Sequence, residues 1–391
     1  MAEFTQLTTY LAAQPGFEAF RTEAAATLDQ LDGEPADTLF RRLGSPIFRG
    51  WLSTFANAEA FTPDNKVVCE QLTLWNNIRY GFLAPAQYRA TMRVIDGMCV
   101  TWDPRLALRV GAEDTVRVEK EGERLIVRSV RGDVLIDADV NEERIAGGVF
   151  AEGCRLVYAP LLPDSQIVVR NDLPLLQLRL LGTQRDDAVS LGSFDHSPSS
   201  YPAFDPARYL EAATIIRDVW PEGYADFQQT LQVVIPRTSP PRWRARGMTI
   251  STFAGAIWLF VDRVVDLVEH MVHEQGHVKL RYIEDTCPIL DPVQTEDRYT
   301  VGWRKDPRPI VGIYEGVFVH LQVLHALSAA VERGAFSAAD LDACEQRIQA
   351  MTAQVEEGLT VLTAHGRFTP TGEAYLAWAE STLDRFRVSL V

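Results

Sequence analysis

Histidines are concentrated in one part of this chain. Five of the seven histidines lie between positions 270 and 325. Within this segment His273, Glu274 and His277 form an H-E-x-x-H motif. Residues four apart share one face of an α-helix, so the two motif histidines can bind one metal ion from adjacent turns. The sequence therefore predicts a metal site in this segment.

A metal ion that does chemistry needs a third protein ligand and an open coordination position. His320 is the first candidate, because a proline-rich return loop can fold its helix antiparallel to the motif helix. Glu315 is the rival; it lies five positions earlier and is not expected to face the same way as His320. His270 and His325 are further candidates, although we expect them to support the ligands or to pack against other side chains.

Two chemistries can use such a site. With zinc, Glu274 would act as general base on a metal-bound water, and the reaction would be peptide hydrolysis. With iron(II), three ligands on one face leave positions for a keto acid and O₂, and the reaction would be an oxidation. The motif alone does not choose between them.

The elements that must position these residues change along the chain. Residues 1–100 are predicted to form a helical region in pieces to about residue 95, with aromatic residues that we interpret as core. Residues 101–200 are predicted to be β-rich, because β-forming residues alternate between Gly and Asp turns. The strand candidates lie at 109–110, 115–118, 124–128, 134–136, 155–159, 165–170 and 175–181. The main boundary is expected near the polar hinge at 195–202, where His196 is expected to be solvated.

Residues 201–391 are predicted to be a mainly helical catalytic domain, which makes the protein α+β. The apolar run from Ile257 to Met271 indicates a buried helix that carries the motif, expected from about 262 to 284. A second helix, at about 311–332, carries Glu315 and His320. Further helices are expected at 205–220, 337–364 (with a capping box at Ser337) and 371–387, and strands at 231–235, 248–250 and 258–260.

Composition argues against several classes of protein. The 391 residues are 47% hydrophobic and 23% charged, as in soluble globular proteins. The formal net charge of −15 argues against a nucleic-acid partner, whose phosphates would be repelled. No apolar run approaches the ~20 residues that cross a bilayer, and no signal-like segment opens the chain, so we expect a cytoplasmic protein without a membrane partner. Five dispersed cysteines without C-x-x-C indicate reduced thiols.

The sequence around the motif resembles a known family. H-E-Q-G-H-V-K-L at 273–280, W-R-K-D-P-R-P-I-V-G at 303–312 and E-G-V-F-V-H at 315–320 occur in this order. They resemble the HExxH-type peptide β-hydroxylases of ribosomal peptide (RiPP) biosynthesis, which depend on iron(II) and 2-oxoglutarate. The resemblance is close over 230–335, loose over 150–390 and absent from the first 100 residues.

The resemblance implies a role for each matching residue. His273, His277 and His320 would bind iron(II). Glu274 would orient the substrate or support the ligands, and need not be a base. At position 315 relatives carry Gln or another polar residue, so Glu315 is a departure; as the third ligand it would complete a two-histidine, one-carboxylate site that also suits iron(II).

The co-substrate site is implied in the same way. Arg304 or Arg308 would pair with a carboxylate of 2-oxoglutarate, because a planar guanidinium matches a carboxylate bidentately. The alternative is that each arginine only forms a surface ion pair near Asp306. Lys279 is a lesser candidate for the co-substrate or for a salt bridge.

These expectations describe an iron(II)/2-oxoglutarate dioxygenase that uses O₂ to hydroxylate a Cβ in a ribosomally made precursor peptide. The peptide would bind as an added strand at the β-rich layer or near 236–250. The alternatives are a zinc metallopeptidase and a catalytically inactive scaffold that binds a peptide. The sequence does not indicate the oligomeric state or the residue modified.

Overall fold

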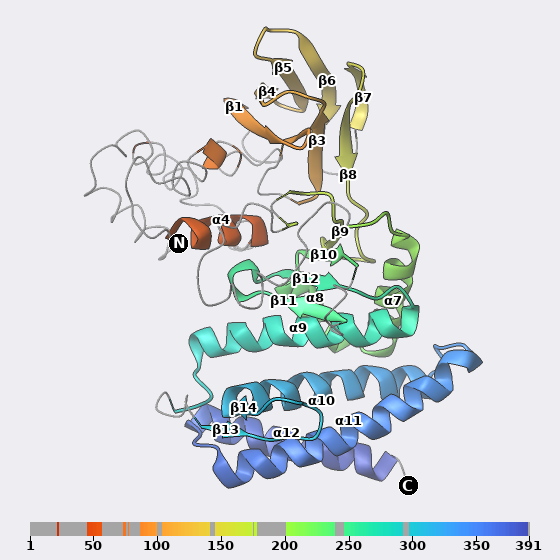
Figure 1. The fold of residues 1–391 in the computed structure, drawn as a ribbon. Coiled ribbons are helices and arrows are strands. Elements are labelled where there is room, and N and C mark those ends of the chain that lie inside the picture. Colours follow the sequence, from red (N-terminus) through yellow and green to blue (C-terminus); the bar gives the residue numbers. More distant parts are fainter. Residues whose placement is uncertain are drawn as a thin grey trace.

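The structure is a computed structural model. It describes residues 45–56, 87–99, 104–140, 145–174, 201–238, 246–291 and 297–389, with the single positions 22, 73–75, 77, 176 and 177 between them. Apart from Thr22, the first 44 residues of the predicted helical region lie outside these residues, as does His196. An antiparallel sheet lies at one end of the molecule, helices α9–α12 at the other, and a small mixed sheet between them (Figure 1). The α+β expectation is confirmed.

The larger sheet is a set of hairpins with its own core. Its order is β7-β6-β5-β4-β1-β2-β3-β8, and all neighbours are antiparallel. Alternate side chains, such as Val116, Val118, Leu125 and Val127, are buried, which is the period-two pattern of a sheet with one covered face. The strands are β1 (Gln87–Ile95), β2 (Met98–Cys99), β3 (Leu106–Val110), β4 (Thr115–Glu121), β5 (Arg124–Ser129), β6 (Val134–Val140), β7 (Ile145–Phe150) and β8 (Cys154–Tyr158).

Strand β1 corrects the predicted helical region 1–100. Its residues were expected to be helical to about position 95, but they pair with β4 and β2. Ala90, Met92 and Val94 are buried while the residues between them are more exposed, so the local period is two and not 3.6. The β-rich region therefore begins at Gln87.

Helix α4 (Pro46–Ala56) carries aromatic residues that the sequence predicted as core. Phe48 and Trp51 are buried, and Trp51 stacks on Trp75 with ring centroids 5.4 Å apart. A Cβ at Gly50 would lie 2.2 Å from the Phe253 ring of the 3₁₀ helix η2 (Ser251–Phe253), so α4 packs closely on the central part of the molecule. For these aromatics the core interpretation is confirmed.

The small sheet has the order β11-β12-β10-β9. Strands β9 (Val168–Val169), β10 (Val233–Pro236) and β12 (Ala256–Leu259) are parallel, and β11 (Gly247–Thr249) is the antiparallel edge strand. Both faces of β10 and β12 are buried, as expected for a covered parallel sheet. The strand predicted at 258–260 is therefore confirmed at 256–259, and α9 begins at Val264, close to the predicted start at about 262.

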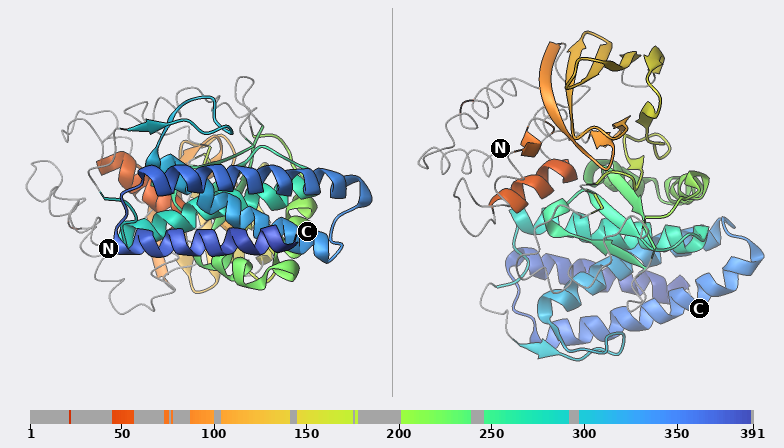
Figure 2. Two further views of the ribbon diagram at one scale, coloured as in Figure 1. Left: turned by 90° about the horizontal axis from the view of Figure 1, so that it is seen from below. Right: turned by 45° about the horizontal axis from the view of Figure 1, so that its top comes forward.

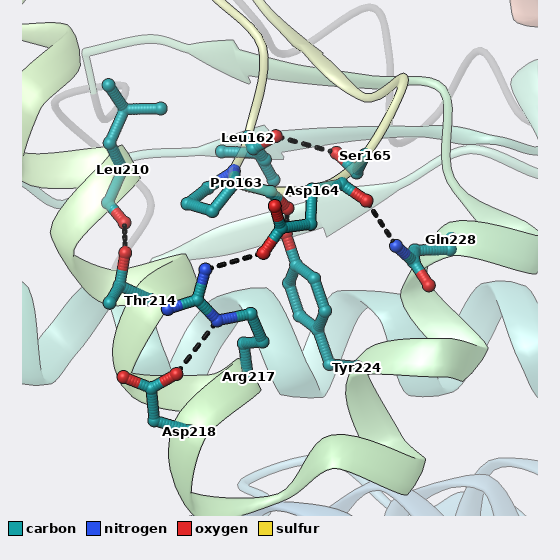
Figure 3. Close-up of polar contacts among 10 residues, drawn as sticks. All are labelled: Leu162, Pro163, Asp164, Ser165, Leu210, Thr214, Arg217, Asp218, Tyr224 and Gln228. Atoms are coloured by element: carbon teal, nitrogen blue, oxygen red, sulfur yellow. Dashed lines mark hydrogen bonds and ion pairs between the residues drawn. The ribbon is translucent and has the colours of Figure 1, made fainter.

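The chain after β8 contacts the first helices of the carboxyl-terminal half. The turn after β8 is attached to helices α7 (Pro206–Val219) and α8 (Pro221–Thr230) (Figure 3). Tyr224 donates its hydroxyl to the carbonyl of Pro163 at 2.5 Å, and Arg217 pairs with Asp164 at 2.7 Å. Strand β9 also joins the small sheet, and most of the predicted boundary at 195–202 lies outside the described residues. Of the strand expected at 165–170 only β9 forms, and 176–177, inside the expected strand 175–181, is a turn.

The carboxyl-terminal helices follow the prediction within a few residues. They are α9 (Val264–Thr286), α10 (Ile310–Glu332), α11 (Ala338–His365) and α12 (Pro370–Ser389), with the short hairpin β13 (Arg298–Tyr299) and β14 (Arg308–Pro309) before α10. Helices α10, α11 and α12 lie side by side (Figure 2). The predicted capping box at Ser337 does not form, since this hydroxyl binds the Asp340 carboxylate and not a backbone N–H.

Helix α10 corrects one expectation from composition. Among the described residues it is the one helix long and apolar enough to cross a membrane, judged over an 18-residue window of its sequence. Two thirds of that window is buried inside the protein, where α10 packs against α9, α11 and α12. Its apolar character matches that of a central core helix.

Candidate metal centre

Three histidines from two helices converge between α9 and α10. The two helices run antiparallel, as the sequence predicted (Figure 1). The ring centroids of His273 and His277 are 5.0 Å apart, and those of His273 and His320 are 5.8 Å apart. The helical spacing brings the first two together, and the return of the chain through 287–309 brings His320 to them.

A glycine in the motif allows this close approach. A Cβ at Gly276 would lie 3.0 Å from Cγ1 of Val319, the neighbour of His320 on α10. A larger residue at this position would push the two helices apart. The second variable position of H-E-x-x-H therefore helps to set the distance between His277 and His320.

Burial keeps all three histidines neutral. It lowers the pKa of His277 and His320 to about 4, and that of His273 well below its ordinary value. His277, His320, His270 and Arg304 lower the pKa of His273 further. Neutral imidazole is the form that binds a metal ion. The buried Nδ1 of His320 has no hydrogen-bond partner in the described part of the chain.

The separations of these rings fit one metal ion with a small adjustment. Two imidazoles that bind an ion at about 2.1 Å have ring centres roughly 4.5–5.2 Å apart. The 5.0 Å between His273 and His277 falls in this range, and the 5.8 Å between His273 and His320 is slightly longer. Among the described residues no three His, Cys, Asp or Glu side chains already surround a common point. The His320 ring must move inward to complete a three-histidine site.

Glu274 is enclosed between α9 and the edge strand β11. Its side chain is 5% exposed, and its Oε2 accepts a hydrogen bond of 2.7 Å from the Thr249 hydroxyl. A Cβ at Gly247 would lie 2.4 Å from Oε1 of Glu274, so only glycine lets the strand lie this close. Burial raises the pKa of Glu274 to about 7, and the Thr249 hydrogen bond partly opposes this rise. Glu274 can therefore hold or release a proton near neutral pH.

The loop before α10 covers His320. The Trp303 ring meets His320 edge-on, with centroids 6.0 Å apart. The loop is attached to α11 in two places. The Gly302 N–H donates to Glu357 at 2.8 Å, and the Trp303 ring packs so closely on Gly358 that a Cβ there would lie 2.9 Å from it. The W-R-K-D-P-R-P string thus forms one wall of the histidine site.

The two arginines of this loop flank one carboxylate. Nε of Arg308 is 3.1 Å from Asp306, and Nε of Arg304 is 3.9 Å from it. Arg304 also lowers the pKa of His273, so its charge acts on the histidine cluster. Of the two arginines, Arg304 is thus the one whose charge is seen to act on His273.

Two other candidates lie away from the histidines. Nζ of Lys279 pairs with Asp226 of α8 at 2.5 Å, which is the salt bridge that the sequence left open. Burial raises the pKa of Glu315 to about 7; the charge of Glu284 adds to this rise and Arg281 opposes it, which places Glu315 beside the later turns of α9. His320 is therefore the third histidine-site residue that the fold provides.

A buried ion-pair cluster beside the histidines was not foreseen. Arg347 of α11 binds both Asp266 and Glu269, the latter at 2.8 Å, and Arg246 lies 3.5 Å from Asp266. Next to this cluster is His270, with its ring centroid 6.3 Å from that of His273. The sequence could have indicated this cluster through two acids, Asp266 and Glu269, on the buried face of α9. Their partners come from elements far away in the sequence.

Comparisons with known proteins do not assign the chain. No family model matches it, and no curated protein matches it. The function therefore rests on the residues and geometry of the site.

Proposed function

We propose that this protein is an iron(II)- and 2-oxoglutarate-dependent oxygenase that hydroxylates a Cβ of a residue in a ribosomally made precursor peptide. The observation that carries the proposal is the convergence of His273, His277 and His320 beside the loop that holds Arg304. A neutral ligand set next to a guanidinium suits a metal that also takes a carboxylate-bearing co-substrate.

The three histidines would hold the metal on one face. Bound there, iron(II) would supply O₂ activation, with 2-oxoglutarate oxidised to succinate and CO₂ while one oxygen atom enters the peptide. Burial at the α9–α10 interface holds the imidazoles neutral and excludes bulk water from that side of the site. Trp303 covers His320 and restricts its ring to the side facing His273.

Of Arg304 and Arg308, Arg304 is the better candidate to bind the 2-oxoglutarate carboxylate that is not bound to the metal. Its charge reaches His273, whereas Arg308 pairs more closely with Asp306. Asp306 lies between both guanidinium groups and would hold the Arg304 side chain ready for the incoming anion. A bidentate guanidinium–carboxylate pair would fix the orientation of the co-substrate.

The peptide would lie along β11. This strand is the edge of the small sheet and runs beside Glu274, so an extended peptide added to it passes close to the histidine cluster. Thr249 holds the Glu274 carboxyl in place. With a pKa of about 7, that carboxyl could accept a hydrogen bond from a peptide N–H or donate one to a peptide carbonyl.

A zinc metallopeptidase is the second candidate, and the same carboxyl favours it. A buried Glu with a pKa of about 7, next to two neutral histidines and an edge strand, has the properties of a general base for water attack on a peptide bond. Under this alternative Arg304 would have no part in binding a co-substrate.

Anaerobic reconstitution separates the two candidates. Purified full-length protein would receive iron(II) and then 2-oxoglutarate, and the visible charge-transfer absorption of the iron–keto-acid chelate would be recorded. The oxygenase proposal expects this absorption, and expects it to disappear with succinate formation when O₂ is admitted. Iron(II) binding without the chelate absorption contradicts the proposal.

A peptide pool provides the second readout. Incubation of a synthetic pool with the iron(II), 2-oxoglutarate and O₂ system is expected to add one oxygen atom to some members, detected by mass spectrometry. A zinc-loaded sample serves as the parallel reaction. Cleavage of pool members by the zinc form, with no oxygen added by the iron form, would favour the metallopeptidase.

A further inference from the structure

Exposed apolar side chains gather at one edge of the larger, antiparallel sheet. Of the five large hydrophobic side chains exposed in the described part of the chain, four lie in β6, in β7 or in the turn before β6: Val130, Val134, Val149 and Phe150. Val149 is the most exposed of them, at 73%. Val134 lies two residues from Ile136, the cross-strand partner of Phe150. Clustered exposed apolar side chains mark interaction surfaces more often than single ones do, so this edge is a candidate for one.

Strand β7 forms this edge and lies at the margin of the sheet (Figure 1). It pairs with β6 on one side, and no described strand pairs with its other side. Its sequence, I-A-G-G-V-F, contains no charged residue and no proline, which are the residues that usually protect an edge strand from pairing. Residues 147–150 are all exposed. The edge therefore has the features of a site at which an extended segment adds to a sheet.

The two glycines of β7 have different surroundings. A Cβ at Gly148 would lie 2.6 Å from the Cβ of Ala138 on β6, so the packing of the two strands requires this glycine. A Cβ at Gly147 would meet nothing within 4 Å, and the backbone there does not have a positive φ. No contact in the described part of the chain therefore requires glycine at position 147. Its effect is to leave a gap in the exposed face of the strand.

A carboxylate lies behind this gap. Asp139 of β6 is the cross-strand partner of Gly147, and Asp137 is that of Val149, so these four residues share one face of the hairpin. Arg124 binds Asp137 through two hydrogen bonds of 2.9 and 2.8 Å. Asp139 is exposed and has no hydrogen bond or ion pair with a described residue through its side chain. The face thus offers one carboxylate without a cation partner beside an exposed valine.

An added strand would contact both features. Neighbouring strands lie about 4.8 Å apart, so a Lys or Arg side chain on the added strand can extend across Gly147 to the carboxylate of Asp139. A residue two positions away on the added strand lies on the same face and would contact Val149. The segment that fits therefore carries a basic residue two positions from an apolar one.

We propose that the outer edge of β7 binds an extended peptide segment of another protein, with a basic residue for Asp139 and an apolar residue for Val149. A second copy of this chain is a poorer match, because pairing two β7 strands would bring together two molecules that each carry a net charge of −15 and an exposed Asp139. The edge shares no residue with the histidine centre, so the proposal does not depend on the proposed oxygenase function.

Fluorescence anisotropy with designed peptides tests the proposal. The probe is a fluorescein-labelled T-V-T-K-T-V-T peptide, which has a valine two positions from the lysine in either strand direction. Full-length protein without metal or 2-oxoglutarate is titrated into it, and saturable binding is expected. A peptide with glutamate in place of the lysine is expected to bind about fivefold more weakly, because an exposed ion pair is lost. No saturable binding of the lysine peptide up to the solubility limit of the protein overturns the proposal.

A backbone-modified peptide tests for strand addition. The lysine peptide with N-methylated amides keeps every side chain but has no N–H donors for a ladder on either of its edges. It is expected to show no saturable binding over the same protein concentrations. Equal binding of the two peptides would mean that the lysine peptide does not add to β7 as a strand, and would refute the assignment.

Two variants locate the peptide on β7. Asp139→Asn is expected to weaken the lysine peptide about threefold and to leave a peptide with glutamine at the same position unchanged. Gly147→Lys places a cation of the protein itself in the gap, and is expected to reverse the preference between the lysine and glutamate peptides. Asp114→Asn is the matched control, because it removes an exposed acid from the turn before β4 of the same sheet. This control should bind both peptides like the unaltered protein.

Thermal unfolding checks that each variant is folded, and the comparison of peptides on the unaltered protein stands even if a variant does not fold. Equal effects of Asp139→Asn and Asp114→Asn would mean that the overall charge of the protein selects the lysine, which refutes the assignment. Analytical ultracentrifugation without peptide gives the last readout, and a monomer is expected. A dimer that Gly147→Lys dissociates would assign the edge to a second copy and overturn the proposal.

Discussion

Two polar clusters lie one turn apart on α9, and they are built in opposite ways. Near the start of the helix Asp266 and Glu269 are buried against Arg347, so negative and positive charges compensate each other. One turn later His273 and His277 are buried with His320, and burial, other histidines and Arg304 lower their pKa values. Both clusters are costly to bury, but only the first contains its own counter-charge.

The difference indicates what each cluster is for. A compensated cluster is complete, so its contribution is to hold α9 against α11. A group of neutral imidazoles has lone pairs but no cation to share them with. A metal ion is the partner that such a group binds. We therefore propose that burial on the same helix serves stability in one turn and cation binding in the next.

The largest expected effect tests the histidine cluster. His320→Ala is expected to weaken binding of iron(II) or cobalt(II) by more than about 100-fold, since losing even an outer partner of a metal ligand costs about 10–100-fold. The metal should also raise the melting temperature of the unaltered protein but not of this variant. Isothermal titration and thermal unfolding measure both.

Glu315→Ala is the matched control on the same helix. It is expected to retain metal affinity, because Glu315 lies beside Glu284 and Arg281 and not at the histidines. If Glu315→Ala abolishes binding and His320→Ala retains it, the third ligand has been assigned to the wrong residue.

The compensated cluster should affect stability instead. Arg347→Met leaves Asp266 and Glu269 without their main partner; both acids are 11% exposed and Arg347 is 19% exposed. Removing one partner of such a pair is expected to lower the free energy of unfolding by about 3 kcal/mol. Urea unfolding measures this, with Arg387→Met at an exposed pair as a control that should show no measurable loss.

Glu315, which lies beside Glu284, should change the free energy of unfolding in the opposite direction when it is replaced. The pKa of Glu315 is about 7 in the folded protein, against an ordinary 4.5, so the folded state binds more protons between these values. Stability from this group is therefore present below pH 4.5 and is lost as pH rises to 7. Glu315→Gln is expected to match the unaltered protein at pH 4.5 and to exceed it by about 2 kcal/mol at pH 8. Equal stabilities at both pH values in urea unfolding would disprove this assignment.

The smallest effect concerns the two arginines of the loop. Arg304→Gln is expected to weaken 2-oxoglutarate about tenfold in the anaerobic chelate titration, as for the loss of one charged hydrogen-bonded pair. Arg308→Gln should change it little, because its guanidinium lies closer to Asp306. A larger loss in Arg308→Gln than in Arg304→Gln would reverse the proposed roles.

Much of the helical region could be predicted from the sequence, because helical periodicity is local. The positions of α9, α10, α11 and α12 agree with the expected ranges within a few residues. The predicted secondary structure was wrong where the hydrophobic period changes within a few residues. Strand β1 lies in a segment expected to be helical, whereas β12 was predicted, within two residues, inside an apolar run that continues into α9. Short apolar runs fit both a strand and a buried helix until their neighbours are known.

The candidate site could be predicted only in part. The spacing of His273 and His277 brings them together on any helix, and the antiparallel return of α10 was sufficient to select His320. The roles of the cations could not be predicted, because they depend on partners far away in the chain. Lys279 is paired with Asp226, 53 positions earlier, and Arg347 reaches back 81 positions to Asp266.

By itself the sequence determined the helices, the four-residue spacing of the motif histidines and the acids on the buried face of α9. These follow from backbone periodicity, which acts over a few residues. Tertiary structure decided which polar groups are compensated, that Glu274 lies under β11, and that β7 forms an exposed edge of the larger sheet. Charge compensation and strand exposure are properties of contacts between distant segments, so they appear only when the chain is folded.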